Sequence, residues 1–169
     1  KISMNEETGA VRFIRFEPGS VRLSAPSTAP AEEKSRTFLR NYGSIFGIEN
    51  VDAELQAIGT RRDAYGGEHA TFKQSYRGVP VFGAELRAHF RDGNLSAVNG
   101  TVVPGLKISS TPSLRPEEAA GRAIRTVTAQ EVRRGQVERD LGNEASDPDE
   151  IFEDLTAVAT TLMIFRAGL

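Results

Sequence analysis

Apolar and polar residues alternate over two neighbouring stretches near the middle of the chain. In residues 69–77 the apolar positions are Ala70, Phe72 and Tyr76, with Gln74 on the same face. In residues 84–91 Ala84, Leu86, Ala88 and Phe90 alternate with Glu85, Arg87, His89 and Arg91. A period of two is typical of a half-buried strand. The pattern therefore predicts two strands, each with one face toward a core.

The connections between these strands contain the residues that tight turns need. A Gly-Val-Pro-Val-Phe-Gly corner over residues 78–83 separates the two arms, and Asp92-Gly93 follows the second arm. Asp and Gly tolerate the positive φ of a hairpin turn, so a third strand is expected to follow in an antiparallel meander. Gln74 interrupts the apolar face, and a buried carboxamide needs hydrogen-bond partners. We favour a structural role, in which it ties down a loop or strand, over contact with a ligand.

The preceding residues predict a strand, a helix and a further strand. Thr8–Phe16 is rich in β-branched and aromatic residues and indicates the first strand. A change to helical spacing then predicts four to five turns of helix that begin at Ser27 or Thr28 as cap and end at Gly47. The apolar stripe of this helix consists of Phe38, Leu39, Tyr42, Ile45 and Phe46, and the strand that follows contains Leu55, Ala57 and Ile58.

Two prolines and a glycine within residues 102–112 predict a domain boundary, which divides the chain into residues 1–106 and 107–169. After it, Ser113 and Pro116 indicate the start of a second helix and Gly135 its end. An acidic loop is expected over residues 138–154, and a strand over residues 155–165. One helix and one strand are too little for a domain, so we expect the pairing strands after Leu169 or elsewhere in the assembly.

Composition excludes several classes of function. The 169 residues include no cysteine, which removes disulfides, cysteine-ligated zinc and thiol catalysis. A net charge of −2 offers no basic footprint for nucleic acid, and no apolar run reaches the length of a membrane span. The absence of cysteine is compatible with the cytosol and with export. No signal peptide is visible, and a chain that begins at Lys1 is expected to be a processed piece with its targeting segment upstream.

No catalytic arrangement can be assembled from the sequence. The His-Glu-x-x-His motif of zinc proteases is absent, as are a nucleophile elbow, a Walker loop and a dinucleotide fingerprint. His69 and His89 fall on the polar faces of predicted strands, where solvated side chains or side chains at the rim of the core are expected. Asp147, Asp149 and Glu150 are weak calcium candidates because the spacing and glycine of an EF-hand are missing. We therefore predict that this segment is not an enzyme and holds no cofactor or metal.

The meander resembles the fungalysin/thermolysin propeptide (FTP) domain. The resemblance lies in residues 74–86, QSYRGVPVFGAEL, in Asp92-Gly93 and in Val98-Asn99-Gly100, and it extends back through residues 42–47. Residues 114–124 and 161–169 are similar to the start of a PepSY-type propeptide domain. The implied fold class is α+β: an antiparallel sheet packed on a helix, followed by a second, incomplete cystatin-like or PepSY α+β unit.

The resemblance implies the N-terminal pro-region of a secreted, extracellular zinc metalloendopeptidase. Such a pro-region assists folding of the catalytic domain and inhibits it until autocatalytic cleavage. Its partner would be that domain, in cis or as a cleaved complex, and zinc, with calcium as an open second metal, would lie in that domain. The alternatives are a non-catalytic peptide-binding or surface-binding module of the same fold and, less favoured, an enzyme that uses a cleft of this fold.

Two sets of residues follow from this interpretation. The matching glycines, proline, glutamine and tyrosine are expected to determine the fold: Gln74, Tyr76, Gly78, Pro80, Gly83, Gly93 and Gly100. The motif itself does not specify which residues touch the protease. Polar-face residues are the candidates for that contact surface, with solvent exposure as the simpler alternative: Lys73, Arg77, Arg87 and His89.

Overall fold

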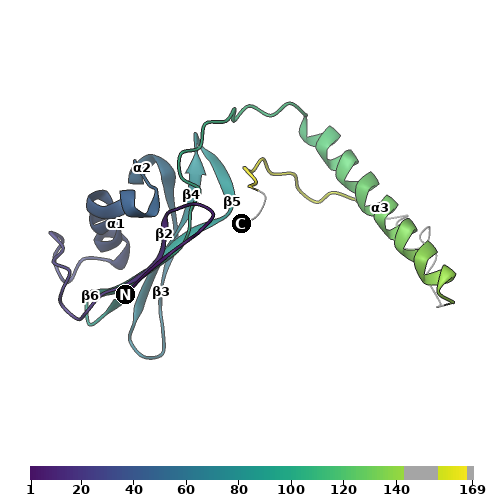
Figure 1. Cartoon of the computed structure of the whole chain (residues 1–169). Helices are drawn as coiled ribbons and strands as arrows, with labels where there is room; N and C mark the ends of the chain where they lie inside the picture. Colours follow the sequence, from purple (N-terminus) through teal and green to yellow (C-terminus); the bar gives the residue numbers. More distant parts are fainter. Residues whose placement is uncertain (143–155, 167–169) are drawn as a thin grey trace. The chain divides into compact units, whose positions relative to one another are not determined.

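A computed structural model describes residues 1–142 and 156–166 of the chain. The chain divides into two compact units, Lys1–Ser110 together with Met163–Leu169, and Thr111–Leu162 (Figure 1). The first unit contains the sheet, and the second contains one long helix. No helix in the described part of the chain combines the length and apolar character that crossing a membrane requires.

The first unit is built on a six-stranded sheet in which all neighbouring strands are antiparallel. The strands lie in the order β1-β2-β6-β5-β4-β3, so the last four along the chain form a continuous meander. This arrangement confirms the predicted α+β class and the predicted antiparallel meander. The strands are β1 Ile2–Met4, β2 Val11–Arg15, β3 Leu55–Arg62, β4 Glu68–Tyr76, β5 Val79–Arg91 and β6 Asn94–Thr101.

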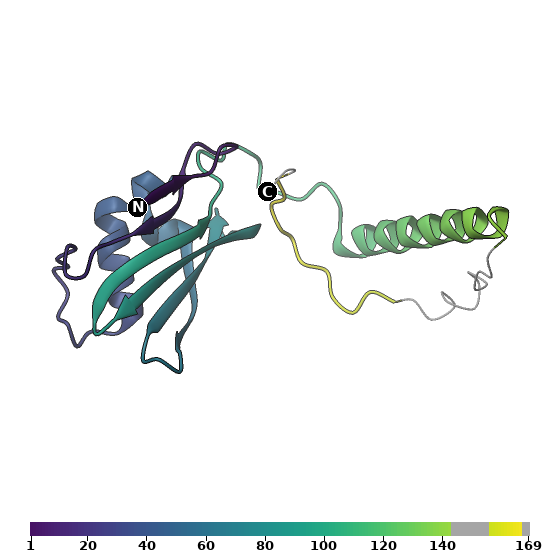
Figure 2. The ribbon, with the colours of Figure 1, turned by 60° about the horizontal axis from the view of Figure 1, so that its bottom comes forward.

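Three helical segments, α1 Ala31–Tyr42, the 3₁₀ turn η1 Gly43–Phe46 and α2 Val51–Glu54, cover one face of the sheet (Figure 2). The prediction of Ser27 or Thr28 as the cap was wrong, since Pro30 takes that position and no side chain caps the helix. Pro30 is already extended at ψ 147, and its carbonyl accepts the first helical bond from the Lys34 N–H.

The helical stripe is narrower than its spacing predicts. Phe38, Leu39 and Phe46 are buried, whereas Tyr42 and Ile45 remain exposed. The chain changes from an α-helix to a 3₁₀ turn after Tyr42, and side chains three residues apart eclipse in such a turn, so Ile45 lies in line with the exposed Tyr42. Gly47, with φ 83, ends the segment as predicted.

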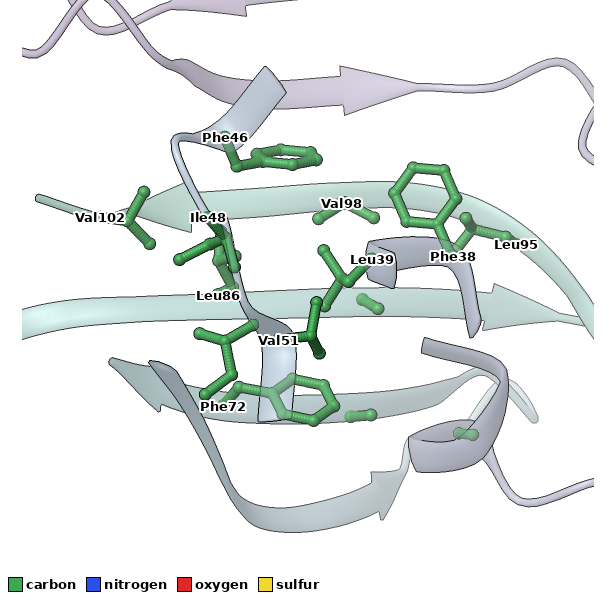
Figure 3. Close-up of a cluster of buried hydrophobic side chains, with 14 of the residues drawn as sticks. Phe38, Leu39, Phe46, Ile48, Val51, Phe72, Leu86, Leu95, Val98 and Val102 are labelled. Carbon is green, nitrogen blue, oxygen red and sulfur yellow. The ribbon is translucent and has the colours of Figure 1, made fainter. Parts of the chain in front are cut away.

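The main core lies between these helices and one face of the sheet. Phe72, Leu86 and Val98 project from three adjacent strands into one cluster with Phe38 and Leu39 of α1 (Figure 3). Each such side chain contributes about 1.5–3 kcal/mol by leaving water. The core also includes Phe46, Ile48, Val51, Leu55, Phe90, Leu95 and Val102.

The connection between β4 and β5 differs from the predicted corner. The turn is Arg77-Gly78, where both residues have positive φ, as do Asp92-Gly93 between β5 and β6. Positive φ at both central positions is the geometry of a two-residue hairpin that matches the twist of the strands. Residues 79–91 form one strand, interrupted by a bulge over residues 81–84 opposite Gln74, and Gly83 adopts φ 72 within it.

The second unit contains α3, Pro116–Asp140. Pro116 begins the helix as predicted, but the cap is Arg115 and not Ser113. The backbone N–H and the guanidinium of Arg115 both donate to the Glu118 carboxylate. The prediction that Gly135 ends the helix was wrong. Glycine in a helix costs only about 1 kcal/mol relative to alanine, so the helix continues to Asp140, and Gly142 with φ 78 follows its end.

The strand predicted over residues 155–165 does not form in the described residues from 156 onward. Only Ile164 pairs, in an isolated parallel bridge to Val81. A β-rich sequence becomes a strand only when a partner accepts its hydrogen bonds, and Val158 is 98% exposed. Of the predicted acidic loop, residues 138–140 belong to α3; the rest, including the calcium candidates Asp147, Asp149 and Glu150, falls mainly outside the described residues.

Candidate docking surface on the sheet

The sheet has a second face, opposite the helices, which we call the open face. Strand register places polar side chains on it in cross-strand rows, because directly paired residues point to the same side. Figures 1 and 2 show α1 and α2 on the other side of the sheet. The open face includes Arg61 in β3; His69, Thr71 and Lys73 in β4; Glu85, Arg87 and His89 in β5; and Ala97 and Asn99 in β6.

The open face is basic, although the whole chain carries a net charge of −2. Among the residues just named, three carry a positive charge, Arg61, Lys73 and Arg87, and one carries a carboxylate, Glu85. Arg87 is held in place: its Nε donates to Thr71 Oγ1 at 3.2 Å and its Nη2 to Glu85 Oε1 at 2.8 Å. A basic group fixed in this way loses little side-chain entropy when it binds a partner.

The two histidines are joined across the open face. His69 and His89 are register partners, and their Nδ1 atoms lie 2.7 Å apart. His69 Nε2 lies 2.9 Å from Asp63 Oδ2, and His89 Nε2 is hydrogen-bonded to Asn99 Oδ1. Both rings are half-buried, as expected of histidines at the rim of a strand face, but they are paired with each other and not free in solvent.

Sequence reasoning missed this pair because the bulge shifts the register of β4 and β5. Counting outward from the Arg77-Gly78 turn without a bulge would place His69 opposite Leu86. That pairing would put a polar and an apolar residue on one face, and a register shift by an odd number of residues removes the conflict. The alternation pattern thus contained the signal: the observed shift is three residues and brings His69 opposite His89.

Two members of this group have displaced pKa values. Burial lowers the pKa of His89, and the neighbouring His69 and Arg87 act in the same direction, against the hydrogen bond to Asn99. The pKa of Asp63 is lowered by its hydrogen bond to His69 and by the N–H groups of Gly67 and Tyr65. Asp63 is therefore an ionised acceptor at neutral pH.

Gln74 lies on the core face, opposite the bulge, and only 2% of it is exposed. Its Nε2 donates to the Val103 carbonyl at 2.8 Å, and its Oε1 accepts from the Val103 N–H at 2.8 Å. The carboxamide thus makes the two hydrogen bonds that the backbone of a neighbouring strand residue would make, and it fixes the segment that follows β6. Val103 packs there with Val81, Ala84 and Ile164 in a second, smaller core.

The other residues singled out by the sequence divide between these regions. Lys73, Arg87 and His89 share the open face of β4 and β5. Arg77 lies in the turn beyond it, with its guanidinium 5.2 Å from the ring of Tyr76.

The glycines and the proline of the motif lie where the backbone is constrained. Gly78 and Gly93 occupy turns, and Gly83 and Pro80 lie in or beside the bulge. Gly100 in β6 has no room for a side chain, because a Cβ there would overlap the carbonyl oxygen of Glu85 in β5. Within residues 1–142 and 156–166, no group of three or more His, Asp or Glu side chains could hold a metal ion.

Comparison with known proteins identifies the meander. Residues 53–102 match the Fungalysin/Thermolysin Propeptide Motif, which confirms the resemblance predicted for this block. A 52-residue stretch is 48% identical to thermolysin of Alicyclobacillus acidocaldarius subsp. acidocaldarius and equally to thermolysin of Bacillus caldolyticus, covering 31% of this chain and 10% of each relative. The thermostable neutral protease NprT of Geobacillus stearothermophilus is 33% identical over 78 residues, 44% of this chain and 14% of the relative. The matched stretches thus span between a tenth and a seventh of the relatives' lengths.

Proposed function

We propose that the chain is part of the N-terminal pro-region of a secreted zinc metalloendopeptidase, which it helps to fold and then inhibits until autocatalytic removal. The observation that carries the proposal is the match of residues 53–102 to the Fungalysin/Thermolysin Propeptide Motif. That stretch coincides with strands β3 to β6, the part of the sheet that packs against α1 and α2.

In this proposal the open face docks against the catalytic domain. A rigid sheet backed by a helical core presents its side chains in fixed positions, which reduces the entropy lost on binding. Lys73, Arg87 and His89 lie together on this face, and Arg77 extends the basic surface beyond the end of β4. The partner surface is then expected to be acidic, since complementary charges set the orientation and raise the association rate.

The roles of the remaining parts follow from the same proposal. Residues 1–106 form the FTP-like propeptide domain, and residues 107–169 begin a PepSY-like domain whose further strands lie elsewhere in the precursor. Zinc, with calcium as a second metal, belongs to the catalytic domain. The pro-region acts on that domain in cis or, after cleavage, as a complex.

A refolding experiment tests the folding role. The cognate catalytic domain is denatured and refolded with and without this chain added in trans, and the yield of active peptidase is measured. We expect a higher yield when the chain is present. A chain with Phe72→Ala, which removes a ring from the core, is the control for an unfolded additive. Equal yields with wild-type chain, control and buffer would contradict the proposal.

The gene that encodes the chain offers a second test. We expect a downstream His-Glu-x-x-His segment, because two imidazoles one helical turn apart bind the zinc and the glutamate activates water. If the complete reading frame lacks that motif, the chain is instead a binding module of the same fold.

A further inference from the structure

The two histidines belong to a row of four polar side chains that crosses the open face. Asp63 follows β3, and His69, His89 and Asn99 lie on the three strands of the meander that follow it, β4, β5 and β6. Successive members are hydrogen-bonded, and we call the group the histidine relay. These two are the only histidines in the sequence, so imidazole signals report on the relay alone.

Assigning hydrogens from the Asp63 end determines which atom donates and which accepts in the first two bonds of the relay. Asp63 is fully used as an acceptor: Oδ1 accepts from the Tyr65 and Gly67 N–H groups, each at 2.8 Å, and Oδ2 faces His69 Nε2. An ionised carboxylate cannot donate, so His69 Nε2 carries a hydrogen. In the neutral ring His69 Nδ1 is then a bare acceptor. The hydrogen between the two Nδ1 atoms therefore belongs to His89.

Asn99 decides whether His89 carries a second hydrogen. With the amide oxygen toward the ring, His89 Nε2 must donate and His89 is charged. With the amide turned, its NH₂ donates to a bare Nε2 and His89 is neutral; the two orientations have the same shape. All three hydrogen bonds of the relay can therefore form when both rings are neutral, and also when His89 carries one added proton.

A second added proton breaks the relay. It would occupy His69 Nδ1 and place two N–H donors on like-charged rings against each other across 2.7 Å. Among the residues that the structure describes, Asp63 is the one carboxylate bonded to the pair, and Glu85 is already paired with Arg87. Strand register places five further cations around the two histidines. Arg61 in β3 lies opposite His69, Lys73 follows His69 along β4, and Arg87 and Arg91 flank His89 in β5. Arg15 in β2 is paired with Ala97, which in turn is paired with His89.

We propose that the histidine relay is an acid-sensitive link that ties the Asp63 turn to β4, β5 and β6 while it holds at most one added proton. It opens when both histidines are charged. The burial that lowers the pKa of His89 favours the closed, uncharged relay at neutral pH. This property belongs to the isolated chain and does not depend on the pro-region role.

The opening is expected to be local. The turn after β3 is exposed, with Tyr65 88% accessible, and β3 is an edge strand. The second proton leaves His69 Nε2–H donating to Asp63, so when the charged rings separate the Asp63 turn moves with His69, while Phe72 and Leu86 hold the same strands from the core face. A response confined to the turn therefore distinguishes the link from general acid unfolding.

Nuclear magnetic resonance of the ¹⁵N-labelled chain tests the proposal between about pH 8 and about pH 5, the range in which histidine titrates. At the upper end we expect single tautomers, Nε2–H for His69 and Nδ1–H for His89. On acidification the amide signals of residues 63–67 should change in step with the second imidazole titration, while that of Phe72 stays constant. Tautomer mixtures in both rings, or titration without a response in the turn, would overturn the proposal.

Two variants separate the relay from ordinary titration. The Asn99 amide can present either its oxygen or its NH₂ to His89, whereas the carboxylate in Asn99→Asp can only accept. His89 should therefore stay charged to higher pH, with its titration midpoint raised by about one pH unit. His69→Gln removes the central partner and should make the turn signals insensitive to pH over this range. An unchanged His89 midpoint in Asn99→Asp, in a chain whose other amide signals match the wild type, would also refute the relay.

Discussion

The two faces of β4 and β5 are made by alternate residues of the same strands, yet they are held by different forces. On the core face Phe72, Leu86 and Phe90 are almost completely buried by the helical segments. On the open face, order comes from polar contacts between side chains, such as Arg87 with Thr71 and His69 with His89. The core face determines the fold, whereas the open face can change its chemistry at little cost to stability, which suits a surface that binds a partner.

The largest expected difference between the faces concerns neighbouring residues of β4. Phe72→Ala should destabilise the first unit by about 3–5 kcal/mol, because it removes a buried ring and leaves a cavity. Lys73→Ala, one residue along and exposed, should change stability by no more than about 0.5 kcal/mol. Denaturant unfolding monitored by circular dichroism measures both values. Comparable losses of stability in the two variants would contradict the difference between the core face and the open face.

A smaller loss is expected at Gln74, the polar residue on the core face. Gln74→Ala leaves the N–H and carbonyl of Val103 without their partner and should cost about 1–3 kcal/mol. Gln56→Ala on the exposed edge strand is the matched control, and unfolding midpoints in urea compare the two. If the variants were equally stable, Gln74 would not be fixing the segment that leaves β6.

A loss smaller than those at Phe72 and Gln74 is expected at the bulge in β5. Gly83 has φ 72, and no atom lies within 4 Å of an added Cβ, so Gly83→Ala costs only backbone strain, about 1–2 kcal/mol. Gly83→Asn should recover part of this loss, since asparagine tolerates the left-handed region better than alanine. Thermal unfolding of the three chains gives the order. An alanine variant as stable as the wild type would show that the bulge does not require this conformation.

The sequence predicts the meander well because the alternation of apolar residues is local information. The turn at Asp92-Gly93 and the buried face of β4 follow directly from it. The histidine relay requires the register of β4 against β5, and the bulge over residues 81–84 sets that register. Only the conflict between His69 and Leu86 in an unbulged hairpin indicated that a register shift was needed.

Elsewhere the predictions failed where tertiary context decides. Gly135 lies within α3, because one glycine costs a long helix too little to end it. In its described part, residues 156–165, the β-rich segment forms a single bridge, at Ile164, since a strand needs a partner to pair with. In both places, local propensity was correct in direction but insufficient to determine the structure.

Inhibition of the cognate catalytic domain tests the central claim most directly. The activity of the mature protease is titrated with the wild-type chain and with the Lys73→Glu/Arg87→Glu variant, after both are shown to be equally folded. We predict that the wild type inhibits and that the variant inhibits at least about tenfold less, because two charges at the proposed interface are reversed. Absence of inhibition by the wild-type chain would contradict the inhibitory role, and equal inhibition by both chains would contradict docking through the open face.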